Sequence, residues 1–449
     1  MKQNRMLDGA VGSTLFFFAL PMIVGNLFQQ FYNMADTMIV GRFVGEDALA
    51  AVGASYSFTN VFIMIAIGGG MGASVLTSQY LGAGEYGRMR TSAYTALINF
   101  LVVSIALACF GFFMNPQIMR ALKTPENIFD DAVLYLQIYF TGLPFLFMYN
   151  VLSATFNALG KSRIPLYFLI FSSVLNIILD LWMVLGWHMG VAGVAIATVA
   201  AQGLSAVASF FVLLWELKQY PQPEGTPLRL YDREMLFQGT RIAIPSIIQQ
   251  SIVSIGMLLV QSVVNGFGSS VLAGYSAGSR VESICIVPMI ATGNAVSTFT
   301  AQNLGAKQTQ RVRQGLKSSF LMILCFGAGI WLILNQFHGQ IIAAFIDAEG
   351  GGVAYETGNA FVSFIKWFFV LIGFKAATDG VLRGSGDVNV YMAANLVNLG
   401  IRVLVANLCA PVWGMEAVWA AIPLGWAVNF LISYSWYRTG RWSRKQIIT

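Results

Sequence analysis

The sequence predicts an all-α membrane protein with twelve transmembrane helices in two pseudo-symmetric six-helix lobes. Its 449 residues are 57% hydrophobic and only 10% charged, and the mean hydropathy is +0.68. About a quarter of the residues in soluble domains are charged, so this composition excludes an ordinary soluble protein. Apolar segments of membrane-spanning length follow one another along the whole chain, and the second half of the chain repeats the first.

Each predicted helix is an apolar segment long enough to cross about 30 Å of hydrocarbon. Short polar stretches separate the segments, as expected for helices joined by loops at the membrane surface. We expect the twelve helices at residues 13–40, 50–80, 92–114, 131–157, 164–187, 190–215, 237–264, 271–301, 316–336, 354–381, 389–411 and 414–437.

The basic residues of the connecting segments predict the orientation, because cytoplasmic loops carry an excess of Lys and Arg. With the N-terminus inside, the outer segments hold only Arg42, Arg120 and Lys123, and most other Lys and Arg residues lie in inner segments. We therefore expect a multi-pass protein of the cell membrane with both termini in the cytoplasm. This bias explains the net charge of +6 and gives no reason to expect nucleic acid as a partner.

The two halves share sequence at a nearly constant spacing, which indicates an internal duplication. The stretch QYLGAG at 79–84 recurs as QNLGAK at 302–307, and Pro21 corresponds to Pro245. Six helices return the chain to the same side of the membrane, so the halves have the same orientation, with a substrate site expected between them.

The repeat and one polar, proline-rich stretch predict the domain organisation. A two-lobed chain needs no second copy to build its cavity, so we expect a monomer. The predicted parts are an N-lobe at 1–215, a cytoplasmic linker at 216–238, a C-lobe at 239–437 and a basic cytoplasmic tail at 438–449.

The first predicted helix carries a polar stripe in the stretch LPMIVGNLFQQFYNMADTMIVG. Spacings of three to four residues place the stripe on one helix face. Its members are Asn26, Gln29, Gln30, Asn33 and Asp36. A carboxylate at mid-membrane costs about 2.5–3.5 kcal/mol even on lenient scales, so the stripe should line a pathway or face the protein interior. Polar contacts that merely hold two helices together are the alternative.

A substrate cavity is expected beside this stripe, because Tyr32 and Met34 interleave with the polar residues. Aromatic and thioether side chains can repack around varied amphipathic ligands. Pro21 can kink the same helix, since its ring displaces a backbone hydrogen bond. The predicted cavity residues are Asn26, Gln29, Gln30, Tyr32, Asn33, Met34, Gln250 and Arg402.

A cation or proton site is predicted in the first half. Asp36 and Asp180 are its only acids deep within spans, and Asn176 lies one turn before Asp180 on the same face. With Thr198 they form a set of hard oxygen ligands suited to Na⁺ or to a shared proton. Two close carboxylates cannot both stay ionised in a dry site, so one must share a proton or a cation.

The second half lacks this set. Asn398 corresponds to Asn176, but Arg402 stands where the first half has Asp180. Lys375, Asp379 and Arg383 are spaced by four and are expected to pair with one another on one face. The roles of the remaining charges stay open; these charges are Arg280, Glu282 and Lys366.

Other motifs predict no chemistry. The GKS stretch at 160–162 has Thr155 where a phosphate-binding loop needs Gly. Gly68, Gly69, Gly70 and Gly72 lie within an apolar span and are expected to permit close helix packing. The four Cys residues are isolated, and no nucleophile with a recognisable base occurs, so we expect neither an enzyme nor a bound cofactor.

These features resemble the multidrug and toxic compound extrusion (MATE) transporters over essentially the whole chain. The resemblance rests on Pro21 with FYNMADTMIVG at 31–41, the paired QxLGA stretches, the LGKSR and RGSGD loops and the duplication. It implies two lobes forming a V, alternating access, and drug efflux driven by Na⁺ or H⁺. Within the family, Pro21, Asp36, Asn176, Asp180 and Thr198 match the cation site of the DinF-like branch.

Other functions remain open at this stage. The second-half cations leave a flippase for a lipid-linked oligosaccharide or related lipid as an alternative. A membrane-bound enzyme or a sensor that transports nothing is a second alternative function. The resemblance favours a secondary antiporter in the lipid bilayer that exports small amphipathic, cationic drugs or toxic metabolites. The sequence does not identify the substrate or decide between Na⁺ and H⁺.

Overall fold

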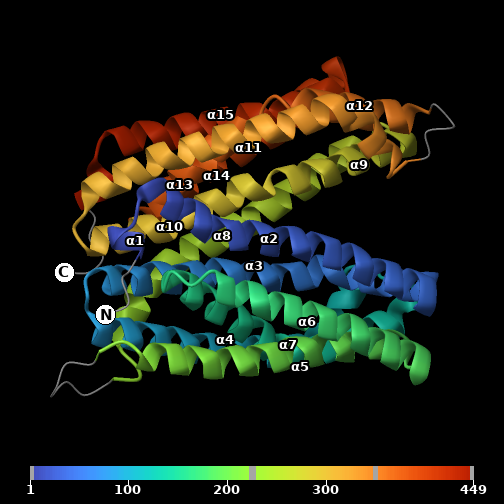
Figure 1. The fold of residues 1–449 in the computed structure, drawn as a ribbon. Coiled ribbons are helices and arrows are strands. Elements are labelled where there is room, and N and C mark those ends of the chain that lie inside the picture. Colours follow the sequence, from blue (N-terminus) through green and yellow to red (C-terminus); the bar gives the residue numbers. More distant parts are fainter. Residues whose placement is uncertain (1–4, 222–228, 347–351, 445–449) are drawn as a thin grey trace. The chain divides into compact units, whose positions relative to one another are not determined.

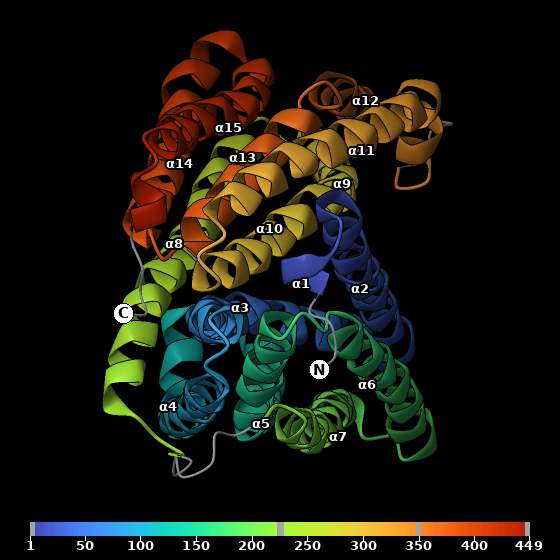
Figure 2. The ribbon, with the colours of Figure 1, turned by 60° about the vertical axis from the view of Figure 1, so that its left-hand side comes forward.

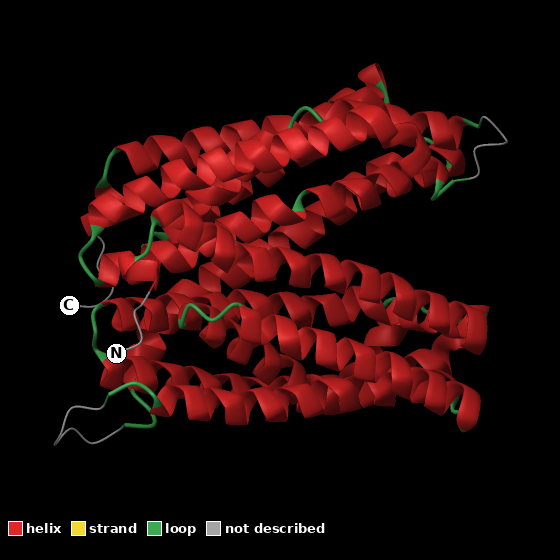
Figure 3. Cartoon of the chain, in the orientation of Figure 1, coloured by secondary structure: helices red, strands yellow, loops and turns green. Residues whose placement is uncertain are grey.

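The computed structural model describes residues 5–221, 229–346 and 352–444, which form helices joined by short turns without a strand (Figures 1 and 3). The elements are α1 (Arg5–Asp8), α2 (Val11–Ile39), the π-helical turn η1 (Val40–Val44), α3 (Glu46–Gly82), α4 (Tyr86–Ala121), α5 (Glu126–Ala158), α6 (Arg163–Leu181), the π-helical turn η2 (Trp182–Gly186), α7 (Gly190–Lys218), α8 (Arg233–Asn265), α9 (Ser269–Cys285), α10 (Val287–Gly305), α11 (Thr309–Ala343), α12 (Val353–Ile365), α13 (Phe369–Gly384), α14 (Val388–Trp413), α15 (Met415–Arg438) and the 3₁₀ turn η3 (Arg441–Arg444).

The helices confirm the predicted spans. Within the described residues, 11 helices are long and apolar enough to cross a membrane, and the bent pair α12 and α13 passes the same test when the two are taken together, which gives up to 12 spans. The prediction of one continuous helix at 354–381 is wrong, because this span bends by 56° at a break between Ile365 and Phe369. Lys366 lies in the break, where its ammonium donates to Asn335 Oδ1 at 3.0 Å, rather than deep within a helix.

The chain divides into two compact units, which we call the N-unit (Val24–Ile247) and the C-unit (Met1–Ile23 with Ile248–Thr449). Their bounds differ from those of the predicted lobes, since the start of α2 groups with the C-unit and the start of α8 with the N-unit. Both divisions follow shortly after a repeated proline, Pro21 in α2 and Pro245 in α8. The unit boundaries thus fall at corresponding positions of the two repeats.

Corresponding helices have corresponding neighbours inside each unit. In the N-unit, α5 packs against α3, α4 and α7, and Figure 2 shows α4, α5 and α7 side by side. In the C-unit, α13 packs against α10, α11 and α15. The two units therefore repeat one helix arrangement, as the sequence repeat predicts.

The glycines of α3 permit close packing, as expected. A Cβ on Gly72 would stand 2.5 Å from the Gly239 carbonyl oxygen, and one on Gly68 would stand 2.7 Å from Ile247 Cα. Any larger residue at these two positions would separate α3 from the first part of α8. The glycines thus fix α8 to the N-unit.

Both ends of the predicted linker 216–238 are helical. Helix α7 continues to Lys218 and α8 begins at Arg233, and residues 222–228 lie outside the described residues. Of the predicted basic tail, residues 445–449 also lie outside them. Both helices therefore extend into the segment predicted as the linker.

Polar contacts attach the beginning of the linker to the N-unit. Lys161 forms an ion pair with Glu216, and the Arg90 guanidinium donates to the Tyr220 carbonyl oxygen. Burial, with a smaller effect from Tyr86, raises the pKa of Tyr220 to about 12, so its ring stays neutral under ordinary conditions. These contacts hold the first residues of the predicted linker against the N-unit.

Candidate functional site

Three helices of the N-unit bring together the residues of the predicted cation site. The Tyr32 hydroxyl of α2 donates to Asn176 Oδ1 of α6. Asn176 Nδ2 donates to Thr198 Oγ1 of α7 at 3.4 Å, and Thr198 Oγ1 donates to the Val194 carbonyl oxygen at 3.0 Å. These bonds fix the orientation of the Asn176 amide, whose oxygen then points toward α2.

Asp36 and Asp180 complete the site. The Asp180 side chain is fully buried at 0% exposure, and neither of its oxygens has a hydrogen-bond partner among the described residues. Asp36 Oδ1 is likewise buried without a partner. The two carboxyl groups lie within reach of one shared hydrogen bond, which forms only if one of them carries a proton.

The charge of the two carboxyl groups determines which ligand this site can bind. Two adjacent carboxylates in a dry environment repel each other and lack the hydrogen bonds that would replace water. A shared proton or a bound cation removes both costs. The described residues contain no group of three or more His, Cys, Asp or Glu side chains that could hold a metal ion, so further ligands would be neutral oxygens such as those of Asn176 and Thr198.

The sequence spacing explains this assembly in part. Asn176 and Asp180 are four residues apart, as are Tyr32 and Asp36, so each pair occupies one helix face. Tyr32 was expected to line the substrate cavity, whereas the structure places its hydroxyl on Asn176. Tyr135 of α5, which the sequence analysis missed, lies within electrostatic range of both carboxyl groups. No local spacing signals Tyr135, since it comes from a different helix.

The hydrogen bonds of the remaining stripe residues are made along α2 itself. Gln29 donates to Asn33 Oδ1 at 2.9 Å, and the Thr37 hydroxyl donates to the Asn33 carbonyl oxygen at 2.8 Å. Asn26 is exposed, while Gln30 and Met34 are partly buried. Of the stripe residues, Asp36 thus belongs to the carboxylate pair, whereas Asn26 and Asn33 are exposed.

Two predicted cavity residues belong to the C-unit. Gln250 lies on α8, and its carbonyl oxygen accepts a hydrogen bond from Ser254 at 3.2 Å. The Arg402 side chain runs along Gly425 of α15, where a Cβ would meet its Cγ at 3.1 Å. Their place in a common cavity with residues of the N-unit stays a prediction.

Asp379, a buried acid of the C-unit, differs from Asp180 because it is fully paired. Asp379 accepts from Ser433 Oγ at 2.6 Å and from Asn395 Nδ2 at 3.2 Å, and Lys375 Nζ lies 3.1 Å from its Oδ2. The predicted pairing of Lys375 with Asp379 is confirmed. Arg383, which was expected to join them, is instead bound to α10.

Two residues of α10 bind the Arg383 guanidinium. It donates to Asn294 Oδ1 at 2.7 Å and to Ser297 Oγ at 3.1 Å. The prediction that Arg383 pairs on the face of Lys375 and Asp379 is therefore wrong, because the interhelical contact with α10 offers it oxygen acceptors.

Comparison with known proteins identifies the family. The family model described as MatE matches the chain twice, over residues 21–182 and 245–408. The chain belongs to the MATE transporter family. The two matches begin at Pro21 and at Pro245, which confirms the duplication. As a member of a transporter family, the protein is not an enzyme.

A curated relative and two solved structures resemble the MATE chain along its whole length. The probable multidrug resistance protein YpnP of Bacillus subtilis (strain 168) is 30% identical over 450 residues, covering 100% of both chains. An outward-facing multidrug resistance MATE family transporter of the MOP superfamily has a TM-score of 0.89 at 21% identity, covering 99% of both chains. A MOP superfamily transporter from Pyrococcus furiosus Vc1 has a TM-score of 0.90 at 21% identity, also covering 99% of both. At this identity the structural likeness shows the fold alone.

Proposed function

We propose that this MATE protein is a secondary antiporter that exports amphipathic, cationic drugs or toxic metabolites in exchange for Na⁺ or H⁺. The observation that carries the proposal is the Asp180 carboxylate, which is fully buried beside Asp36 and has no hydrogen-bond donor among the described residues. A structural acid is normally paired, as Asp379 is. An unpaired one in a transporter fits a site that a mobile cation occupies and leaves.

The coupling site consists of Asp36, Asn176, Asp180 and Thr198, with Tyr32 holding the Asn176 amide. When the cation binds, it screens the two carboxylates from each other. When the cation leaves, the Asp36 and Asp180 carboxylates repel each other again. Binding and release of the cation therefore change the electrostatic force on Asp36 and on α2, which carries it. Pro21 lies near the point where α2 passes from the C-unit to the N-unit, and it is therefore the proposed hinge for this response.

The exposed and partly buried residues of α2 outside the carboxylate site form the proposed substrate surface of the N-unit. It combines amides such as Asn26 and Gln30 with Met34, and Phe31 is 59% exposed. Polar, aromatic and thioether groups together suit amphipathic ligands. Gln250 and Arg402 are the proposed contributions of the C-unit. Drug export agrees with the name of the Bacillus relative.

Exchange requires that the cation and the drug favour opposite states of the transporter. In the proposed cycle, the cation binds from outside at Asp36 and Asp180, the first helix changes shape near Pro21, and the drug is released outward. Cytoplasmic drug then binds the inward-facing state. The basic-residue bias supports a cell-membrane location with both termini inside. A monomer, no nucleic-acid partner and the DinF-like branch are further proposals.

Dye transport in proteoliposomes tests the proposal. A fluorescent organic cation is loaded, and a Na⁺ gradient or a pH gradient is imposed separately. We expect one gradient to drive efflux in the wild type and none to do so in Asp36→Asn. Asp130→Asn, which replaces an exposed acid of α5, is the matched control.

Three outcomes are informative. Gradient-driven efflux that survives in Asp36→Asn would overturn the coupling site. Efflux lost in Asp130→Asn as well would show that the variants act through general damage. Folded wild type that moves no dye under either gradient would overturn drug antiport and favour the lipid flippase.

A further inference from the structure

A cavity opens at the end of the N-unit where η1 and η2 lie. Its volume is about 400 Å³, and its walls come from the segments 44–48 and 188–192 and from α5. We call it the loop cavity. Glu46, Asp47 and Asp131 are among its lining residues, so its wall is acidic. Under the proposed orientation, it faces the outside of the cell.

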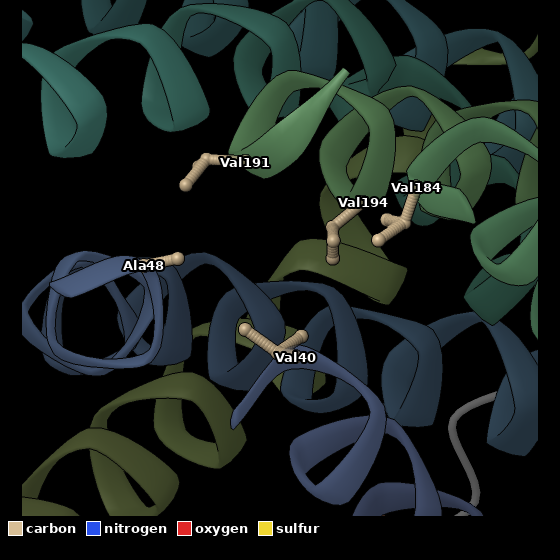
Figure 4. Packing of buried hydrophobic residues seen from close by; sticks show 5 residues of the cluster. All are labelled: Val40, Ala48, Val184, Val191 and Val194. Carbon is tan, nitrogen blue, oxygen red and sulfur yellow. The ribbon is translucent and has the colours of Figure 1, made fainter. Parts of the chain in front are cut away.

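Five buried apolar side chains form a cluster next to this cavity. Val40 and Val184 come from the two π-helical turns, Ala48 from α3, and Val191 and Val194 from α7; each is 5% exposed or less. Figure 4 shows the five side chains gathered between the helices that carry them. We call this cluster the valine plug.

The plug lies between the loop cavity and the carboxylate pair. On each of three helical segments, a site residue, a plug residue and a cavity residue follow one another at intervals of about one helical turn. The runs are Asp36, Val40 and Val44 on α2 and η1; Asp180, Val184 and His188 on α6, η2 and the turn after them; and Thr198, Val194 and Val191 on α7. Val191, like Ala48, belongs to the plug and also lines the cavity, so these two residues form the outer side of the plug.

Helix α5 shows the same order. Asp131 and Leu134 line the loop cavity, while Tyr135 packs against the plug and lies within electrostatic range of Asp36 and Asp180. Four helical segments therefore agree that a path from the cavity to the carboxyl groups passes through the plug.

A layer of valines closes such a path by excluding water, since apolar constrictions gate by dewetting. The Asp180 side chain is 0% exposed, which is consistent with a closed layer. Two of the valines lie on π-helical turns, which interrupt regular helices and often occur at functional sites.

We propose that the valine plug is the gate between the loop cavity and the Asp36–Asp180 site, and that the coupling cation passes it from the cavity. The inference rests on the proposed function of the carboxylate pair. Val40, Val184 and Val194 would then control access of the ion, while the carboxyl groups bind it. The acidic wall of the cavity favours cations on the approach.

Cysteine accessibility tests the gate without requiring transport. The four native cysteines, none of them in a disulfide, are first replaced. Ala192→Cys then reports on the cavity and Thr198→Cys on the far side of the plug. With a small cationic methanethiosulfonate, we expect Ala192→Cys to react about tenfold faster than Thr198→Cys, as a barrier of about 1.4 kcal/mol would produce.

Val184→Thr makes the plug polar at almost unchanged volume. It should raise the reaction rate of Thr198→Cys about tenfold and leave that of Ala192→Cys unchanged. The matched control is Val151→Thr, which introduces the same hydroxyl at a fully buried site of α5 outside the plug. Val184→Ile, which keeps the plug apolar, should not raise the rate.

The outcomes separate the gate from the antiport. If Ala192→Cys and Thr198→Cys react at equal rates while the plug is unaltered, the gate is overturned. The gate is also overturned if Val151→Thr raises the reaction rate of Thr198→Cys as much as Val184→Thr does. If a gradient drives dye efflux but Val184→Thr does not change the reaction rate of Thr198→Cys, the gate is overturned and the antiport is supported. Dye transport is measured in the cysteine-free protein that keeps Thr198. Labelling that follows the plug, together with no dye movement in that protein, would support the gate and overturn the antiport.

Discussion

The Tyr32 hydroxyl on α2 donates a hydrogen bond to the side-chain oxygen of Asn176 on α6. Asn176 donates in turn to Thr198 on α7, so one chain of polar groups joins three helices beside the carboxylate pair. Asn176 is only 1% exposed, so water has little access to replace the tyrosine. Through this bond, the position of α2 affects the orientation of a proposed cation ligand.

Tyr32→Phe should weaken coupling without removing a carboxylate. Leaving the buried Asn176 oxygen without its donor costs about 1–3 kcal/mol and frees the amide to rotate. We expect the cation concentration for half-maximal dye efflux to rise about tenfold, for which 1.4 kcal/mol suffices. The maximal rate should change less, because both acids remain. Tyr167→Phe, at a site that is 62% exposed, is the control and should behave as wild type.

Asp180→Asn should abolish the stabilisation of the folded protein by the coupling cation. A ligand that binds only the folded state stabilises it by about 1.4 kcal/mol at ten times its dissociation constant. The wild-type melting temperature should therefore rise as the coupling cation replaces choline, and the Asp180→Asn temperature should not. Asp130→Asn should respond like wild type. A cation response that persists in Asp180→Asn would show that the ion binds elsewhere.

Much of the fold could be predicted because a bilayer leaves few choices. Backbone groups in hydrocarbon must be satisfied within helices, so long apolar segments become spans, and their duplication reveals the repeat. The break after Ile365 could not be predicted, since neither Pro nor Gly marks it. The π-helical turns η1 and η2 also left no signal in the apolar pattern.

The site could be predicted only where its geometry is local. Asn176 and Asp180 share a helix face by spacing alone, whereas the partner of Tyr32 depends on how α2 is rotated against α6. The same limit explains Arg383. Its spacing from Asp379 suggested a pair, but its acceptors lie on α10, far away in the sequence.

Gly72→Ala should destabilise the N-unit. The new methyl group would stand 2.5 Å from the Gly239 carbonyl oxygen, so the backbones of α3 and α8 must move apart. Overpacking of this kind costs about 1–3 kcal/mol. Gly53→Ala on the same helix meets no atom within 4 Å and should be neutral or stabilising by about 0.5–1 kcal/mol. Melting temperatures measured by fluorescence-detected size exclusion compare the two, and equal temperatures would contradict the close-packing assignment.

Asp379→Asn should destabilise the C-unit by removing the charge that pairs with Lys375. The two side chains are 5% and 16% exposed, and breaking a buried pair from one side costs about 3–5 kcal/mol because the other charge stays behind. The double variant Lys375→Met with Asp379→Asn removes both charges and should recover most of the melting temperature. Its gradient-driven efflux per folded molecule should match wild type, since coupling is assigned to Asp36 and Asp180. A well-folded double variant without efflux would place Asp379 in the transport mechanism instead.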